Sequence, residues 1–354
     1  MSILKINETP VRTSRNFNIN NVKLEDIQIP ENLKEFKGTT IVQNNSNIKL
    51  SSNIEKYNIT YGLGDFFTNQ VLEKANKNIN IEIDGSDEKN INIDNILSSD
   101  NLNLIDNVKI LANENSKATI VIKYKSDKNI ESFHNGIIKI IAKSNSNINI
   151  IIVNLLSETS NNFLSIDAEL EESSKIKATI IDFGGKNSII NYYSNLIGDL
   201  SDNKLESIYL GKNNQLIDIN YIAELRGKKS NIDINVQGAL KDQAKKHFKG
   251  TIDFKKGCKK ATGNENEECM LLSNKAKSIA LPMLLCSEED VEGNHSSSAG
   301  KVGEKELFYI MSRGFNFKEA MKLMVRAKFN KILENIKDEN LKQEILDEIN
   351  TKLD

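Results

Sequence analysis

The chain has 354 residues, with 47 Lys and Arg against 49 Asp and Glu, so its formal net charge at pH 7 is −2. This balance excludes a strongly basic surface, and we expect no nucleic-acid binding. The longest apolar run, residues 279–286, is far shorter than the ~20 residues that a membrane-spanning helix needs, so we expect no membrane association. The first residues lack the apolar stretch of a secretory signal, and three cysteines is an odd number. We therefore expect a cytoplasmic protein with reduced thiols.

The N-terminal part of the chain has no dominant periodicity. Residues 65–76 have the pattern of a helix, whereas residues 43–52 are rich in Asn and Ser and are predicted to form a loop. Pro10 and Pro30 interrupt the remaining pattern. We therefore expect a short N-terminal region of mixed structure over residues 1–77.

The next part of the chain is built from short stretches rich in Ile and Val, separated by Asn, Ser, Lys, Asp and Gly. In residues 78–83 and 231–236 every second residue is apolar, which is the period of a strand with one buried face. Stretches of similar composition occupy residues 118–124, 136–142, 148–156, 177–183, 205–210, 216–225 and 247–254. Because helical periodicity is nearly absent between them, the region is predicted to be all-β.

Two all-β architectures compete for this region. A sandwich needs many tight hairpins, but the hairpin signals are few, namely Asp-Gly at residues 84–85 and Asn-Gly at residues 135–136. A β-solenoid instead stacks Ile on Ile in successive coils and places Asn at left-handed corners. The sequence therefore favours a β-solenoid over residues 78–301, although it shows no strict repeat period.

Residues 302–354 have the texture of a small helical domain. Residues 303–314 predict a short helix that ends at Gly314. Asn316 followed by Glu319 has the spacing of a capping box, and predicts the start of a second helix. A third helix is indicated by apolar residues four apart, at Leu341, Ile345, Ile349 and Leu353.

The most specific motifs lie near the C-terminus. Residues 281–295 run from Leu-Pro through an acidic turn to His295, and residues 307–314 contain Phe-Tyr and then Arg-Gly. This order resembles the C-terminal signature of the SufB/SufD family, in which a Pro-led strand, an acidic turn and a His precede Phe-Tyr and a helix-ending Arg-Gly. Further segments similar to that family's pattern lie at residues 191–193, 215–218, 248–254 and 270–273.

The resemblance implies a right-handed parallel β-helix between an N-terminal region and a C-terminal helical domain. It implies a non-catalytic scaffold of an iron–sulfur cluster assembly complex, paired through its β-helix with a SufB-like subunit as a hetero- or homodimer. The C-terminal helices would bind a SufC-like ABC ATPase. This chain has no phosphate-binding loop, so nucleotide would be bound by the ATPase and not by this chain.

The resemblance also suggests which subunit type this chain is most like. SufB-type relatives carry a cysteine six residues before the Pro, where this chain has Ala276, and a second cysteine at about the place of Glu268. Both departures favour a short SufD-like chain. SufD-type relatives, however, often carry a cysteine two residues before the His, where this chain has Gly293, so the SufB type stays open as the alternative.

Carried onto this sequence, the family's histidine falls on His295, near a transient cluster at the subunit interface. Imidazole suits iron, so we expect His295 to be a ligand, with Glu292 as a possible metal partner and Cys286 as a possible cluster contact. The simpler alternatives are an exposed His in a polar loop and a buried, inert thiol. We expect His134 and His247 to be ordinary surface residues.

The ATPase contact is predicted at Phe308, Tyr309, Arg313, Gly314 and Phe329. The alternative is that these residues only join the helical domain to the solenoid. A different class of function also stays open. Many β-helix proteins are carbohydrate-active lyases or hydrolases that use paired carboxylates, and the acids between Glu288 and Glu292 could serve that chemistry.

Overall fold

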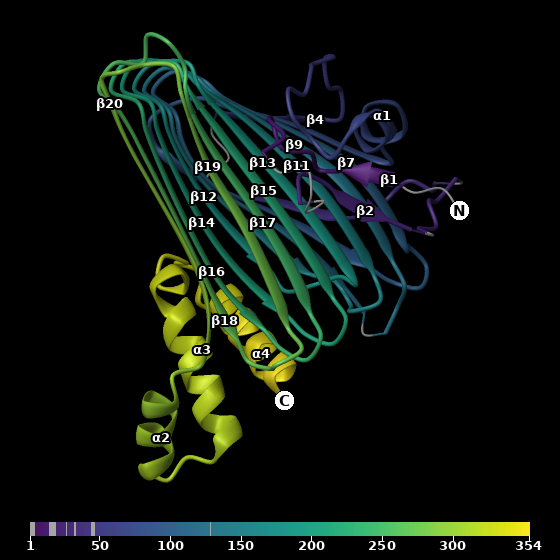
Figure 1. Ribbon diagram of the computed structural model, residues 1–354. Helices are drawn as coiled ribbons and strands as arrows, with labels where there is room; N and C mark the ends of the chain where they lie inside the picture. Colours follow the sequence, from purple (N-terminus) through teal and green to yellow (C-terminus); the bar gives the residue numbers. More distant parts are fainter. Residues whose placement is uncertain (1–3, 14–18, 26, 32, 44–46, 128) are drawn as a thin grey trace.

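Two sheets wind around a common axis in the computed structural model of the chain (Figure 1), which describes residues 4–13, 19–25, 27–31, 33–43, 47–127 and 129–354. Each sheet has nine strands. The first sheet contains, in spatial order, β3 (Thr39–Gln43), β6 (Glu88–Leu97), β8 (Lys117–Ser126), β10 (Asn147–Leu155), β12 (Lys175–Asp182), β14 (Asp202–Gly211), β16 (Asn231–Leu240), β18 (Ala261–Leu271) and β20 (Val291–Lys301). The second contains β4 (Ile48–Ser51), β5 (Lys77–Ile83), β7 (Asn103–Ala112), β9 (Phe133–Ala142), β11 (Asn161–Leu170), β13 (Asn187–Leu196), β15 (Leu216–Leu225), β17 (Lys245–Phe254) and β19 (Lys277–Cys286).

From β5 onward the chain alternates between the two sheets, and each strand pairs in parallel with the strand two places further along the chain. This is a parallel β-solenoid, so the predicted fold class is confirmed. The coils differ in length, because the spacing between paired residues changes from coil to coil. Asn147 pairs with Lys117 on one side and with Lys175 on the other, while Asn231 pairs with Thr262 in a longer coil. This variation explains why the sequence shows no strict period.

The interior of the solenoid is a stack of branched apolar side chains. Ile91, Ile120 and Ile150 occupy one register position in successive coils, and all three are fully buried. Burial of each of these side chains stabilises the folded state by about 1.5–3 kcal/mol. At the corners, residues such as Asn115 and Asn145 adopt φ values of 61° and 59°, a conformation that Asn tolerates better than most residues.

All the predicted apolar stretches coincide with strands, but other strands were not predicted. In β11 and β13 nearly every residue is buried, because other segments cover their outer face, and this removes the alternation that marks a half-exposed strand. The predicted loop at residues 43–52 is wrong where the structure describes it, since Gln43 ends β3 and residues 48–51 form β4. These two strands pair antiparallel with β6 and β5 and close the first end of the solenoid.

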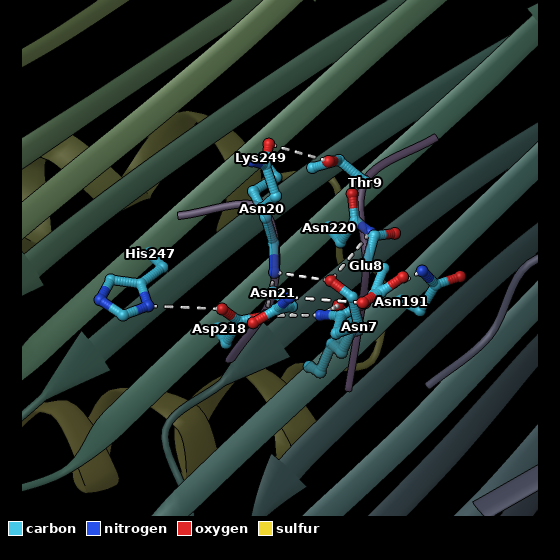
Figure 2. Close-up of polar contacts among 11 residues, drawn as sticks. Asn7, Glu8, Thr9, Asn20, Asn21, Asn191, Asp218, Asn220, His247 and Lys249 are labelled. Carbon is cyan, nitrogen blue, oxygen red and sulfur yellow. Dashed lines mark hydrogen bonds and ion pairs between the residues drawn. The ribbon is translucent and has the colours of Figure 1, made fainter. Parts of the chain in front are cut away.

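The N-terminal segment lies on the outer face of the second sheet. It contributes β1 (Leu4–Ile6) and β2 (Val22–Leu24), which pair antiparallel, and is followed by α1 (Asp65–Lys74), the predicted helix. Figure 2 shows its polar anchor: Asn7 Nδ2 and Lys249 Nζ both donate to Asp218 Oδ1, each at 2.6 Å. Lys249 also donates to the carbonyl of Asn7 at 2.8 Å, and Asn220 Nδ2 to that of Glu8 at 2.9 Å. The segment therefore supplies hydrogen-bond partners to polar side chains on the outer face of the second sheet.

The C-terminal helices are α2 (Glu304–Ser312), α3 (Phe317–Leu333) and α4 (Glu339–Leu353). The predicted capping box is present, with Asn316 Oδ1 accepting from Glu319 N at 3.0 Å and Glu319 Oε2 accepting from Asn316 N at 2.8 Å. The buried sides of α3 and α4 pack on the outer face of the first sheet, where Phe329 stacks against Phe183 with ring centroids 6.1 Å apart. No helix in the described part of the chain is long and apolar enough to cross a bilayer.

Candidate functional site at the open end of the solenoid

The last coil, formed by β19 and β20, leaves the second end of the solenoid open. Each is the outermost strand of its sheet, and within the described residues neither has a partner on its outer edge. Every residue of β20 after Val291 is exposed. The acidic loop predicted to carry His295 is therefore a strand from Val291 onward, and this correction places His295 on a free sheet edge.

Alternate residues of β20 point toward the solenoid axis. Val291 packs against the main core, and Ser297 Oγ donates to the buried Glu267 Oε2 at 2.9 Å. A Cβ at Gly293 would lie 2.9 Å from the Phe254 ring. His295 has the same parity along the strand as these three residues, so it lies at the mouth of the interior. Glu292 has the opposite parity, so the structure does not bring it onto the face of His295, and the predicted pair of metal ligands is not brought together.

His295 belongs to one continuous line of interior positions, which we call the central ladder. Its members pair in parallel register from coil to coil, and the first six are apolar while the last two are polar. The central ladder consists of Ile91, Ile120, Ile150, Ala178, Leu205, Ile234, Glu265 and His295. The change from apolar to polar occurs one coil before the open end.

Glu265 is the first polar member of the central ladder. It is 2 % exposed, and neither of its carboxyl oxygens has a hydrogen-bond partner among the described residues. Burial, with a further contribution from the charge of Glu267, raises the pKa of Glu265 to about 8. The carboxyl group lies against Gly250, where an added Cβ would sit 2.2 Å from Glu265 Oε2. The glycine therefore makes room for this acid.

Glu267, two residues further on, is held quite differently. Its Oε1 lies 2.8 Å from Lys246 Nζ and accepts from the Tyr209 hydroxyl at 2.8 Å, and its Oε2 accepts from Ser297. Lys246 and Glu267 are both fully buried. A buried ion pair satisfied in this way is a structural unit, because removing either partner would leave an uncompensated charge.

The described residues contain no group of three or more His, Cys, Asp and Glu side chains placed to hold a metal ion. The open end thus combines a buried unpaired acid, an exposed histidine and a free strand edge.

The chain is similar to known proteins over much of its length. The sequence profile described as "SUF system FeS cluster assembly, SufBD core domain" matches residues 95–328.

The chain belongs to the SufB/SufD family. It is similar to the iron–sulfur cluster assembly protein SufD of Bacillus subtilis strain 168, with 27% identity over 252 residues, which cover 71% of this chain and 58% of that protein. It is 23% identical over 240 residues to SufD of Escherichia coli K12, covering 68% of this chain and 57% of that protein. A SufBD family protein of Pyrococcus horikoshii is 28% identical over 163 residues, covering 46% of this chain and 35% of that protein.

This SufB/SufD family member is SufD-like, as its sequence predicted. The match covers only about 58% of the length of the Bacillus subtilis relative. Within this chain the family profile runs from β6 into α3, so it includes the whole central ladder after Ile91.

The cysteines occupy three different settings. Cys286 is exposed at the end of β19, where its thiol contacts the Glu288 carbonyl at 2.9 Å. The alternative of a buried, inert Cys286 is therefore wrong. Cys258 and Cys269 are buried, and burial raises the pKa of Cys258 to about 11. Of the three, Cys286 is the accessible thiol.

The predicted ATPase-contact residues separate into two groups. Phe308 is 75 % exposed and Tyr309 58 % exposed, and the Arg313 guanidinium lies over the Tyr309 ring at 5.2 Å. Gly314 ends α2 with a φ of 99°. Phe329, by contrast, is fully buried between α3 and the first sheet. The prediction that Phe329 meets a partner is therefore wrong, because its side chain joins the helical domain to the solenoid.

His134 is not the surface residue that we predicted. It is fully buried, with Nδ1 2.6 Å from Asn162 Oδ1 and Nε2 2.9 Å from Asp106 Oδ1, and its ring stacks on Tyr124 at 4.0 Å. The sequence around it, His-Asn-Gly, has the composition of a turn but continues the strand β9.

The sequence analysis also missed Glu265, because a strand of mostly polar residues such as β18 gives no sign of which face is buried.

Proposed function

We propose that this chain is a non-catalytic, SufD-like scaffold subunit of an iron–sulfur cluster assembly complex. It pairs with a SufB-like subunit, or with a second copy of itself, through the open end of its solenoid. It binds a SufC-like ABC ATPase through the helices that follow Val302. Membership of the SufB/SufD family favours this role over the carbohydrate-active alternative.

The observation that carries the proposal is the free edge of β20 with His295 on it. An unpaired edge strand presents a row of backbone donors and acceptors that natural proteins normally protect, unless another chain pairs with it. At the other end of the solenoid, β3 and β4 provide an antiparallel cap, whereas β20 is exposed along nearly its whole length. A partner subunit on this edge would bring its own groups next to His295.

The exposed aromatic residues of α2 support the second contact. In Figure 1 the α2–α3 end of the helical domain projects away from the solenoid, and α2 buries none of its residues within the described chain. Large aromatic side chains exposed together are typical of contact surfaces. Phe308 and Tyr309 are therefore the first residues to test for ATPase binding.

In this proposal iron and sulfide are cargo, and the chain performs no bond-breaking step. His295 would hold the nascent cluster transiently, since a neutral imidazole is a good iron ligand and releases metal when it is protonated. The partner ATPase would bind and hydrolyse nucleotide. Its dimerisation would strain the paired scaffolds and open their interface to iron and sulfide.

Co-purification tests the partner contacts. The full chain, co-expressed with a SufB-like subunit and a SufC-like ATPase, should retain both, whereas a chain ending at Val302 should retain only the SufB-like subunit. Phe308→Ser should weaken ATPase retention, while Lys305→Ala on the same helix should not. Retention of the ATPase by the shortened chain would show that the contact lies elsewhere.

The site is tested by metal content. His295→Ala should lower the iron and sulfide bound to the purified complex without preventing its assembly. Asn294→Ala is the matched control, because Asn294 is the neighbouring residue on the outward face of the same strand. Unchanged iron and sulfide in the His295 variant would remove this residue from the function.

A further inference from the structure

Glu265 is a buried acid whose two carboxyl oxygens both lack a hydrogen-bond partner among the described residues, whereas another buried acid, Asp182, keeps partners for one oxygen. Native structures contain few buried polar groups without a hydrogen bond, because leaving such a group unpaired is unfavourable. The neighbouring Glu267 shows that this part of the interior can satisfy a carboxylate fully, through Lys246, Tyr209 and Ser297. Glu265 therefore needs an explanation other than packing.

The surroundings of Glu265 are shaped to accept its carboxyl group. Gly250, on the facing strand β17, has no side chain, and any Cβ there would overlap the carboxyl oxygens. The preceding member of the central ladder is Ile234, which is 1 % exposed. An apolar residue at position 265 would simply have continued the stack.

The next member of the central ladder is His295, which pairs with Glu265 in parallel register. Neighbouring strands lie about 4.8 Å apart, and both side chains have the inward parity. His295 is exposed at the open end, so one layer of side chains separates Glu265 from the surface on which a partner would bind. The two groups are thus an oxygen donor and a nitrogen donor placed one above the other.

We propose that Glu265 and His295 are two ligands of a divalent iron site at the mouth of the solenoid, completed by groups of the paired subunit. Carboxylate oxygen and imidazole nitrogen are both suitable ligands for Fe(II). As with any carboxylic ligand, the proton of Glu265 passes to solvent when metal binds. The inference deepens the proposed function and rests on it, because the paired subunit supplies the remaining ligands.

Anaerobic Fe(II) binding to the complex with its SufB-like partner tests the proposal. Glu265→Gln keeps the size of the side chain and should weaken Fe(II) binding about tenfold or more, as should His295→Ala. Glu268→Gln is the control, because Glu268 has outward parity on the same strand and pairs with Lys328 at 2.5 Å. It should leave Fe(II) binding unchanged.

A second readout separates ligation from folding. Because the Glu265 carboxyl has no partner to lose, Glu265→Gln should not lower the denaturation midpoint of the chain. Fe(II) affinity equal to wild type in the Glu265→Gln complex, or an affinity loss accompanied by an equal loss of folded protein, would overturn the inference. Either result would leave the proposed function intact as long as the complex co-purifies, whereas failure of the wild-type chain to bind its partner would refute the proposed function itself.

Discussion

The middle of the solenoid and its last two coils follow the same backbone path, but the side chains of their central ladder differ in polarity. Along the central ladder, six coils stack apolar side chains, and the last two place Glu265 and then His295 at the same position. The next inward ladder also ends in polar residues, since Val236 is followed by Glu267 and then by Ser297. The fold thus continues to the open end, while the apolar stack of the central ladder does not.

This difference separates two tasks within one architecture. The middle coils bury branched side chains between two sheets whose outer faces are covered by other segments, so their residues serve stability. The last coil has a free edge and exposed side chains, so we expect it to contribute little to stability. Mutations should therefore have large effects on folding in the middle and small effects at the end.

The largest effect is expected at the boundary between the two regions, where Lys246 pairs with Glu267. Lys246→Met keeps most of the length of the side chain but removes the ammonium group, and leaves Glu267 as an uncompensated buried charge. We expect a loss of about 3–5 kcal/mol in the free energy of unfolding, measured by urea denaturation. A loss below about 1 kcal/mol would mean that the buried pair is not a structural unit.

A matched pair of core substitutions compares the two regions directly. Ile150→Ala, in the middle of the central ladder, should lower the free energy of unfolding by about 2–5 kcal/mol. Val291→Ala, in the half-buried last coil, should lower it by less than about 1 kcal/mol. Equal losses at the two positions would contradict the view that the last coil contributes little to stability.

The buried acid Asp182 in the middle coils should make stability depend on pH. Burial raises its pKa from 3.8 to about 6, so the folded state keeps a proton that the unfolded chain has already lost. Stability should therefore fall as the pH rises from about 4 to about 6, and stay level above that with respect to this group. Asp182→Asn can still accept from Asn154 and Ser188, and should be more stable than wild type by on the order of 3 kcal/mol at pH 7. Denaturation midpoints at pH 4 and pH 7 test this, and a difference that does not grow with pH would contradict it.

The smallest effect is expected at Ser297, which donates to Glu267 from the exposed last strand. Ser297→Ala should change the free energy of unfolding by less than about 1 kcal/mol, because Glu267 keeps both Lys246 and Tyr209. Urea denaturation of the isolated chain provides the measurement. A larger loss would show that the last strand helps to hold the interior together.

The sequence predicted the parts of this molecule in which one pattern dominates. Alternation identified β5 and β16, and the Asn316–Glu319 spacing identified the capped start of α3. It did not predict β11 or β13, since strands buried on both faces lose their alternation. It placed His295 near the end of the solenoid but on a loop, whereas His295 lies on the strand β20. The strand was missed because its exposed residues after Val291 have no apolar pattern. The burial of Glu265 and of His134 follows from the register in which successive coils pair. The sequence does not reveal this register, because the coil length varies along the chain.

Hydrogen exchange of the β20 backbone amides tests the central claim most directly. In the isolated chain, amides on the free edge of β20 should exchange rapidly. When the SufB-like partner is added, the same amides should become protected, while those of β10 in the middle of the first sheet should not change. Rapid exchange along β20 in a complex that is demonstrably formed would contradict the account, because the open end would then not be the surface through which the scaffold pairs.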